Sequence, residues 1–294
     1  MQIAIASGKG GTGKTMVAVN LATAIARSHL SSISFLDCDV EAPNAALFLH
    51  PQFDSSVEVV NYVPQIDEEK CNLCGLCVKN CRFNALVASR SKILFFPDLC
   101  HSCGGCTLIC PQGAITETPS RIGLIQSGIS NAISFSQGEL DIGHPSPVGV
   151  IQKIFELHGQ ETADQHDDPV TLVDSPPGVS CPLVASTQGS DFVILVTEPT
   201  PFGLHDLRLA VQLMRNELYI PCGVVINKSD PQIKLIDEFC AELDIPILQR
   251  IPFSRKIAEI YAKGQLLIDA VPSFENLFLE LWQNIQTTMN GKEQ

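Results

Sequence analysis

Short apolar runs rich in β-branched residues alternate along the chain with longer stretches whose apolar residues recur at helical spacing. The short runs predict strands at 2–6, 33–36, 170–173, 192–197, 222–226 and 246–250, with one more near 122–127. The longer stretches predict helices near 14–27, 148–158, 203–218, 232–243 and 273–288. This alternation predicts an α/β fold in which helices cover both faces of a parallel sheet, with a ligand site beyond the carboxyl ends of the strands.

The hydrophobic pattern gives no indication of a membrane span. The longest apolar runs are strand-length, far short of the roughly 20 residues that a membrane-spanning helix needs. The last predicted helix has an apolar stripe, but Glu275 and Glu280 on its polar face would oppose anionic headgroups. We therefore expect this helix to dock on the sheet, without membrane insertion. The amino terminus lacks the features of a secretory signal, so a cytoplasmic location is expected.

Composition and charge narrow the choice of partners. Of the 294 residues, 45% are hydrophobic and 17% are charged, which is typical of a globular protein with a large core. The formal net charge is −13, which disfavours nonspecific attraction to nucleic acid or to an anionic membrane. We therefore expect no nucleic acid partner.

The segment GKGGTGKT lies between the first predicted strand and the first predicted helix. This is the P-loop pattern in the strand–loop–helix context that it requires, with backbone amides cradling phosphates at a helix amino terminus. Lys14 is predicted to contact the β- and γ-phosphates, and the Thr15 hydroxyl to ligate Mg²⁺. The predicted phosphate-binding residues are Gly8, Lys9, Gly10, Gly11, Thr12, Gly13, Lys14 and Thr15.

The second lysine of this loop, Lys9, gives it a resemblance to the deviant P-loop of the MinD, ParA, Mrp and nitrogenase iron-protein group. The resemblance implies a P-loop ATPase that binds ATP or ADP with Mg²⁺ and forms a homodimer closed by ATP. It also implies that Lys9 touches the nucleotide of the partner subunit, acting in catalysis together with Lys14. A solvated loop lysine is the alternative for Lys9.

Two further segments match motifs of the same family. The segment DCDVEAPN follows the second predicted strand, and its Asp39 matches the switch I aspartate that positions the attacking water. The segment DSPPG follows the strand at 170–173; its Asp174 is similar to the Walker B aspartate that holds Mg²⁺ through water, and Gly178 could place its amide on the γ-phosphate.

A third segment bears on the base. Asn227 and Lys228 stand where the family contacts the purine. Asp230 completes N-K-x-D, a pattern that selects guanine in other GTPases, so the choice between ATP and GTP stays open, with the resemblance favouring ATP.

Eight of the twelve cysteines form two quartets with the spacing C-x2-C-x2-C-x3-C. Each cysteine of the second quartet follows its counterpart by 29 positions, which indicates an internal duplication. The pattern resembles bacterial two-cluster ferredoxins, in which the fourth cysteine of each motif ligates the other cluster. A pair of zinc knuckles is the alternative, although zinc would leave the third cysteine of each quartet unused.

The ferredoxin resemblance implies two [4Fe–4S] clusters with crossed ligands. One cluster would be held by Cys71, Cys74, Cys77 and Cys110. The other would be held by Cys81, Cys100, Cys103 and Cys106. Of the remaining cysteines, Cys38, Cys222 and Cys240 are expected to be ordinary buried residues, whereas Cys181 follows the predicted switch II, and a role as a bridging ligand stays open for it.

The chain as a whole resembles the ferredoxin-containing ATPases of the MinD superfamily. We expect a MinD-like ATPase domain at 1–63 and 119–294, interrupted by a small α+β ferredoxin-like domain at 64–118. The leading functional hypothesis is that ATP binding and hydrolysis gate electron transfer from the clusters to an unknown partner. An Mrp-like iron–sulfur cluster carrier and a ParA- or MinD-like positioning ATPase are the alternatives.

Overall fold

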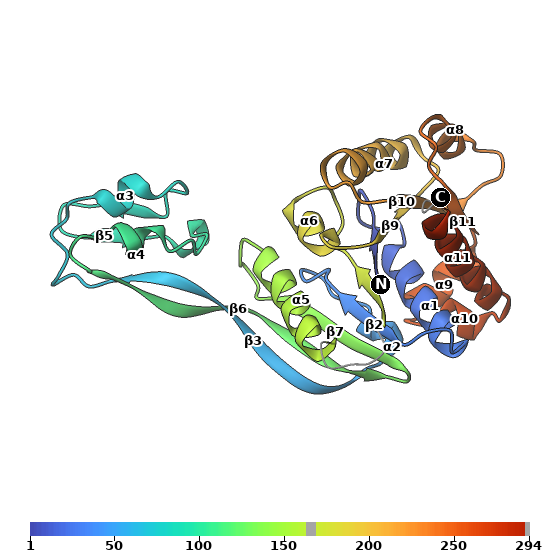
Figure 1. Ribbon diagram of the computed structural model, residues 1–294, viewed down its shortest axis with the longest axis horizontal. Coiled ribbons are helices and arrows are strands. Elements are labelled where there is room, and N and C mark those ends of the chain that lie inside the picture. Colours follow the sequence, from blue (N-terminus) through green and yellow to red (C-terminus); the bar gives the residue numbers. More distant parts are fainter. Residues whose placement is uncertain (163–168, 292–294) are drawn as a thin grey trace.

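The computed structural model describes residues 1–162 and 169–291. Within these residues the main sheet has nine strands in the order β11-β10-β9-β1-β8-β2-β7-β6-β3 (Figure 1). Their bounds are β1 Gln2–Ala6, β2 Ile33–Asp37, β3 Gln52–Ile66, β6 Ile115–Ser130, β7 Ile133–Leu140, β8 Val170–Asp174, β9 Phe192–Thr197, β10 Cys222–Ser229 and β11 Ile247–Pro252.

The strands from β11 to β7 pair in parallel, as the sequence predicts for an α/β fold. The six strands expected to form this sheet are all present. The structure adds β7 to the parallel set, followed by β6 and β3, which pair antiparallel at the edge. The sequence did not indicate β3 and β7, because their apolar positions alternate with polar or glycine positions and are too sparse to stand out.

Helices cover both faces of the sheet (Figure 1). Alternate residues of β1 enter two different cores: Ile3 and Ile5 pack with α1 and α11, and Ala4 and Ala6 pack on the side of α5, α7 and α8. The helices of this part are α1 Lys14–Arg27, α2 Ala46–Leu49, α5 Val148–Thr162, α6 Cys181–Thr187, α7 Pro201–Gln212, α8 Leu235–Glu242, α9 Arg255–Ala262, α10 Leu267–Ala270 and α11 Ser273–Asn290. A π-helical segment, η2 Leu213–Glu217, continues α7.

The last helix turns its apolar stripe inward. Phe278, Leu281, Trp282 and Ile285 of α11 are buried in the same core as α1. The predicted docking of this helix on the body of the fold is therefore confirmed. In the part of the chain that the structure describes, no helix combines the length and the apolar character that a bilayer span requires.

Strands β3 and β6 extend well beyond the rest of the sheet. Their pairing begins with Gln52 opposite Ile129 and ends with Ile66 opposite Ile115. In contrast, β7 pairs with β6 only at residues 123–130. The outer part is therefore a two-stranded ribbon, here called the arm, formed by residues 60–66 and 115–121 (Figure 1). Seven extended residues span roughly 20 Å. The predicted domain boundaries at 64 and 118 fall within the arm.

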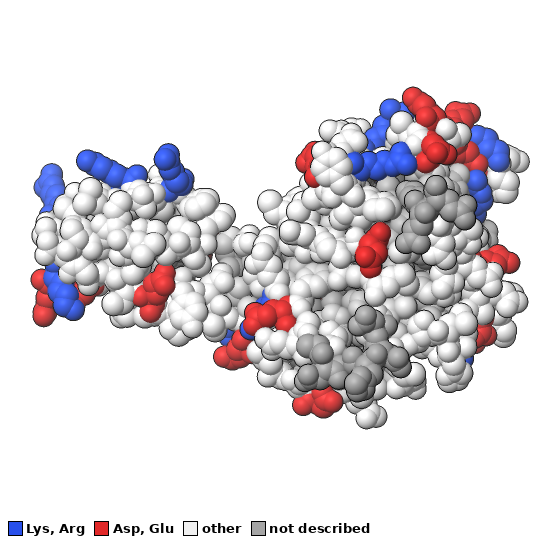
Figure 2. All heavy atoms as spheres, in the orientation of Figure 1, with Lys and Arg blue, Asp and Glu red and all other residues white. Residues whose placement is uncertain are grey.

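The arm carries residues 67–114, here called the cysteine module. The module contains α3 Leu76–Asn80, α4 Gly105–Ile109, the 3₁₀ turn η1 Pro97–Leu99 and a hairpin of β4 Leu86–Ala88 with β5 Ile93–Phe95. Figure 2 shows that the module is set apart from the body of the molecule by a narrow waist. All eight cysteines of the two quartets lie in the module.

A β-bulge and an ion-pair cluster mark the base of the arm. Val59 pairs with Gly123 and Val60 with Arg121, so Ile122 is an extra residue in β6, and its side chain is fully buried. The Arg121 guanidinium contacts Glu58 at 3.1 Å and both oxygens of Asp141 at 3.2 and 3.3 Å. Arg121 therefore ties both strands of the arm to the segment that follows β7.

We predict that Arg121→Gln loosens the arm without unfolding the protein. Exposed ion pairs contribute about 0–1 kcal/mol each, so the free energy of unfolding should fall only slightly. Small-angle X-ray scattering should show a broader distribution of interatomic distances at the longest separations. Arg90→Gln, which removes a module arginine that forms no ion pair among the described residues, is the control. Identical scattering of the two variants would contradict the role of Arg121.

Candidate functional site

The loop between β1 and α1 adopts a backbone that requires glycine. Gly11 and Gly13 have φ angles of 79° and 91°, which side chains other than glycine rarely adopt. A β-carbon on Gly13 would lie 2.2 Å from Asn227 Nδ2, and one on Gly8 would lie 2.5 Å from the carbonyl oxygen of Asp206. The loop is thus packed tightly between the end of β10 and the middle of α7.

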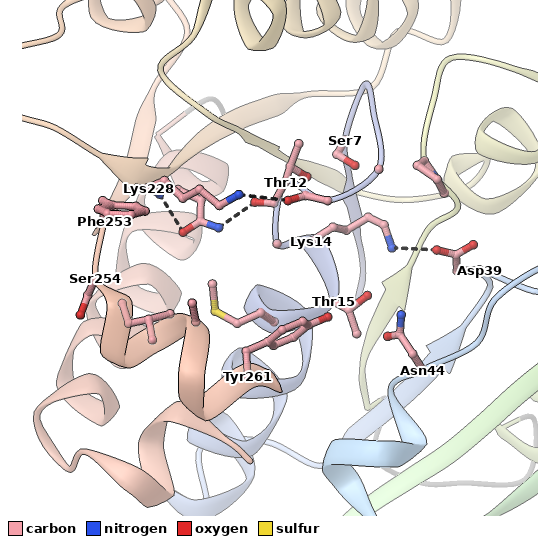
Figure 3. A pocket seen from close by; sticks show the side chains of 18 of the residues that line it. Ser7, Thr12, Lys14, Thr15, Asp39, Asn44, Lys228, Phe253, Ser254 and Tyr261 are labelled. Carbon is pink, nitrogen blue, oxygen red and sulfur yellow. Dashed lines mark hydrogen bonds and ion pairs between the residues drawn. The ribbon is translucent and has the colours of Figure 1, made fainter. Parts of the chain in front are cut away.

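This loop forms one wall of a cavity of about 310 Å³ (Figure 3). The lining residues are Ser7, Gly10, Gly11, Thr12, Gly13, Lys14, Thr15, Met16, Asp39, Asn44, Pro177, Asn227, Lys228, Pro252, Phe253, Ser254, Ile257, Ala258 and Tyr261. The cavity therefore brings together most of the predicted nucleotide-binding residues. Gly8, Lys9, Asp174 and Gly178 stand outside the lining.

The Lys14 ammonium is buried between two carboxylates. Its Nζ lies 2.5 Å from Asp174 Oδ1 and 3.7 Å from Asp39 Oδ2. Figure 3 shows the Lys14 side chain pointing toward Asp39. Burial lowers the pKa of Lys14, but the charges of Asp174, Asp39 and Asp37 outweigh that effect and raise it above its usual value. Lys14 therefore stays protonated.

Asp37 organises the loop that carries Asp39. Its fully buried carboxylate accepts hydrogen bonds from the backbone N–H groups of Asp39 at 3.2 Å, Asn44 at 3.1 Å and Ala45 at 3.0 Å. Burial, followed by the charge of Asp174, raises the pKa of Asp37 to about 7. The sequence motif assigns a role to Asp39 but not to Asp37, because hydrogen bonds from Asp37 to a turn later in the chain leave no recognisable residue spacing.

Several buried polar atoms around the cavity fit a bound magnesium nucleotide. Thr12 Oγ1, Asn44 Oδ1, Asp174 Oδ2 and Ser175 Oγ have no hydrogen-bond partner among the described residues. Buried polar groups are normally hydrogen-bonded, so these atoms indicate positions that phosphate oxygens, magnesium or its water ligands would satisfy. The donor set, with a hydroxyl, an amide and carboxylates, suits a hard cation and a phosphate chain.

Glu198 links Lys9 and Lys228, two of the three lysines that the sequence placed near the nucleotide. Its carboxylate lies 2.5 Å from Lys228 Nζ and 3.9 Å from Lys9 Nζ. Lys228 Nζ also lies 3.4 Å from the carbonyl oxygen of Gly11, and Asn227 Nδ2 donates to the carbonyl oxygen of Thr12 at 2.7 Å. Glu198 follows β9 and belongs to no motif, so its role could not be predicted from the sequence.

The opposite end of the cavity is apolar. It is formed by Phe253 and by residues of α9, including Ile257 and Tyr261, in the arrangement seen in Figure 3. An apolar slot of this kind suits the aromatic ring of a base. Asp230 accepts a hydrogen bond from the backbone of Gln232 and does not line the cavity. The aspartate of the predicted N-K-x-D pattern is therefore not brought to the base-binding end.

The eight module cysteines divide between two further cavities. The first is lined by Cys71, Cys74, Cys77 and Cys110. The second is lined by Cys81, Cys100, Cys103 and Cys106. This partition is the one that crossed ligands would require.

Among the described residues, no group of three or more His, Cys, Asp or Glu side chains is placed to hold a metal ion. In a [4Fe–4S] cluster each thiolate binds a different iron, so the sulfurs surround the cluster rather than converge on one atom.

Backbone groups around the cysteines fit a cluster. The amides of Ala85 and Ala114 donate to Cys81 Sγ and Cys110 Sγ, both at 3.3 Å, and these two pairs are related by the offset of 29 positions. The amide of Ser102 lies 3.4 Å from Cys100 Sγ. Hydrogen bonds of this kind stabilise thiolates that bind iron. The residues present therefore fit the group that the spacing indicates.

Cysteines outside the module are in two different environments. Cys38, Cys222 and Cys240 are buried, as expected, whereas Cys181 is exposed at the first position of α6. Burial raises the pKa of the Cys240 thiol to about 12, which makes it unreactive.

The fold and the phosphate loop together define a nucleotide-binding α/β protein of the P-loop class. The model of the CobQ/CobB/MinD/ParA nucleotide binding domain family matches residues 3–268, so the chain belongs to this family. The chain is similar in fold to the septum site-determining protein MinD of Pyrococcus horikoshii in complex with Mg-ADP, with a TM-score of 0.57, 18% identity and coverage of 97% of this chain and 95% of that one.

Two curated relatives extend over most of the chain. An uncharacterised protein of Methanocaldococcus jannaschii is 28% identical over 273 residues, which is 90% of each protein. The iron–sulfur cluster carrier protein of Synechocystis is 24% identical over 285 residues, which covers 92% of this chain and 65% of the carrier.

We predict that Asp37 makes stability depend on pH in the nucleotide-free protein. Its pKa is raised from 3.8 to about 7, so folding favours the protonated carboxyl. The stability that Asp37 contributes is present below its unfolded pKa and is lost as the pH rises through about 7. Urea unfolding should show that the free energy of unfolding falls more between about pH 5 and about pH 8 in the wild type than in Asp37→Asn. Parallel profiles would contradict the assignment.

Proposed function

We propose that this protein is an ATP-hydrolysing iron–sulfur protein in which nucleotide-driven closure of a homodimer controls electron transfer from two [4Fe–4S] clusters to a partner protein. The observation that carries the proposal is the presence, on one chain, of a P-loop cavity with unsatisfied polar atoms and of two cavities lined by four cysteines each. The partner is an unidentified redox or iron–sulfur protein.

At the nucleotide, the roles follow from charge and position. Lys14 neutralises the β- and γ-phosphates, exchanging part of its contact with Asp174 for phosphate oxygens. Thr15 ligates Mg²⁺ and Asp174 holds it through water, while Asp39 orients the attacking water by hydrogen bonding. The amide of Gly178, which donates to the carbonyl oxygen of Ser7 at 3.0 Å, would exchange this hydrogen bond for one to the γ-phosphate. Lys9 leaves Glu198 to reach the nucleotide of the partner subunit.

The module cysteines hold two clusters that exchange single electrons. Cys71, Cys74, Cys77 and Cys110 bind the first cluster. Cys81, Cys100, Cys103 and Cys106 bind the second. The amides that donate to sulfur stabilise the negative charge of each site.

Coupling between the two functions uses a continuous set of contacts. Val40, next to Asp39, accepts a hydrogen bond from the backbone of Leu140 at 2.8 Å. The next residue, Asp141, binds Arg121 at the base of the arm. A nucleotide-dependent change in the loop that carries Asp39 would therefore alter the support of the arm. Gating requires that the two states differ in their affinity for the electron acceptor.

Cluster transfer to a target protein is the second candidate function. It is favoured by the similarity to the Synechocystis cluster carrier over 92% of this chain. Cys74 and Cys103 are exposed, which would give an acceptor access to each cluster. The two functions differ in what leaves the protein: electrons in the first, and iron with sulfide in the second.

The deciding experiment is a dithionite titration of anaerobically purified protein, followed by EPR, with and without magnesium ATP. Gating predicts that ATP changes the cluster signals or their midpoint potentials while the iron stays bound. Lys14→Ala, which removes the phosphate contact, should abolish that response and serves as the control. Signals that ignore ATP, together with ready transfer of iron to an apo-acceptor, would favour the carrier function. Protein without inorganic sulfide would exclude both.

The ligand partition is tested by two matched double variants. Cys77→Ser with Cys110→Ser removes two ligands from one proposed cluster, so about half of the iron should remain. Cys77→Ser with Cys81→Ser removes one ligand from each cluster, so nearly all of the iron should be lost. Clusters held by consecutive quartets would reverse these two outcomes. Cys181→Ser removes an exposed cysteine outside the module and should leave the iron content unchanged, whereas a loss of iron in this variant would assign Cys181 as a further ligand.

A further inference from the structure

The two cysteine cavities correspond position by position through the offset of 29 residues. Ala114 and Ile115 in the first match Ala85 and Leu86 in the second. The backbone repeats as well, since Gly75 has a φ of 73° and its counterpart Gly104 a φ of 69°. A difference between the two sites therefore stands out against a nearly symmetric background.

The clearest difference in charge is Glu117. It lines the second cavity, whereas its counterpart at the offset of 29 is Ala88, which lines neither cavity. All residues that line the first cavity are described, and none of them is Asp, Glu, Lys or Arg. Glu117 is thus the one fixed charge in the walls of the two sites, again among described residues.

The Glu117 carboxylate lies directly over the cysteine loop of the second cavity. A β-carbon on Gly104, the residue after Cys103, would be 3.2 Å from Glu117 Oε1. In the described part of the chain, no ion pair joins Glu117 to a lysine or arginine within 4.0 Å. Its negative charge therefore acts on the cavity without neutralisation by a paired lysine or arginine of the described chain.

The second cavity is also the one nearer to the nucleotide-binding body. Tyr62, Pro64 and Glu117, which line it, lie on the arm closer to the main sheet than Ile66 and Ile115, which line the first. The site with the additional charge is therefore on the sheet side of the module.

We infer that Glu117 makes the two clusters inequivalent by lowering the reduction potential of the cluster held by Cys81, Cys100, Cys103 and Cys106. This inference rests on the proposed function. Reduction adds one electron, and so one negative charge, to a cluster, and a nearby carboxylate disfavours that addition. The first electron from a one-electron donor thus resides on the cluster of the first cavity. The second electron enters the sheet-side cluster, which is the stronger reductant toward a one-electron acceptor protein.

The test is a redox titration of Glu117→Gln in the full-length, anaerobically purified protein, with dithionite as reductant and EPR as readout. One of the two midpoint potentials should shift upward while the other stays in place. Glu117→Lys should shift the same potential further in the same direction. Glu69→Gln, which removes a module carboxylate that lines neither cavity, is the control and should shift neither potential.

To assign the shifted potential to one cluster, Glu117→Gln is combined with Cys77→Ser and Cys110→Ser. In this background the remaining cluster is the one on the sheet side. The upward shift should persist there. The inference would be overturned, and the proposed function left intact, if both potentials shifted equally. The same holds if neither potential shifted while wild type and variant both contained both clusters. Absence of clusters from the wild-type protein would overturn both.

Discussion

The Lys14 ammonium lies between Asp174 and Asp39, and the charge of Asp37 also raises its pKa. These groups meet because β1, β2 and β8 are parallel neighbours, with Asp37 and Asp174 in register, so that their carboxyl ends converge at one edge. Burying such charges has a large desolvation cost, which only close pairing offsets. One positive charge faces three carboxyl groups, and burial, followed by the charge of Asp174, raises the pKa of Asp37. A divalent cation would reduce this imbalance, which supports the proposal that the nucleotide binds together with magnesium.

The position of the cysteine module follows from the same sheet. An inserted unit does not disturb the phosphate loop when it is attached at an edge of the sheet. β3 and β6 form the edge that is farthest from β10 and β11. The two strands continue outward as the arm, which spares the module any contact with the buried charges. A two-stranded ribbon alone is only marginally stable, so the base of the arm needs the support that Ile122 and Arg121 provide. Glu58 and Pro64 on β3 also discourage further strand pairing at this exposed edge.

Local patterns predicted much of the fold and of the phosphate site. The strand–loop–helix order around Lys14 and the spacing of the cysteines depend on neighbouring residues, and the sequence displays them directly. The contacts that it does not display join residues far apart in the chain. The Asp37 carboxylate accepts a hydrogen bond from a turn that can be recognised only in the folded chain. Glu198 forms its ion pair with Lys9 between residues that are far apart in the sequence. The apolar wall that contains Tyr261 comes from a short helix without a sequence motif. The arm was missed because its polar and apolar positions alternate too weakly to predict a strand of that length.

A sheet whose strands are hydrogen-bonded along their length cannot transmit a local change by bending freely. Between the nucleotide and the module, the loop after β2 and the segment after β7 are the described connections that lie outside the strand ladder. These two segments are joined by the hydrogen bond between Leu140 and Val40, and the second is joined to the arm through Asp141 and Arg121. The bulge at Ile122 interrupts the β3–β6 ladder at the same level, which makes this point the natural pivot of the arm. Through these contacts, a change that the γ-phosphate causes in the loop after β2 would alter the orientation of the arm and so of the module.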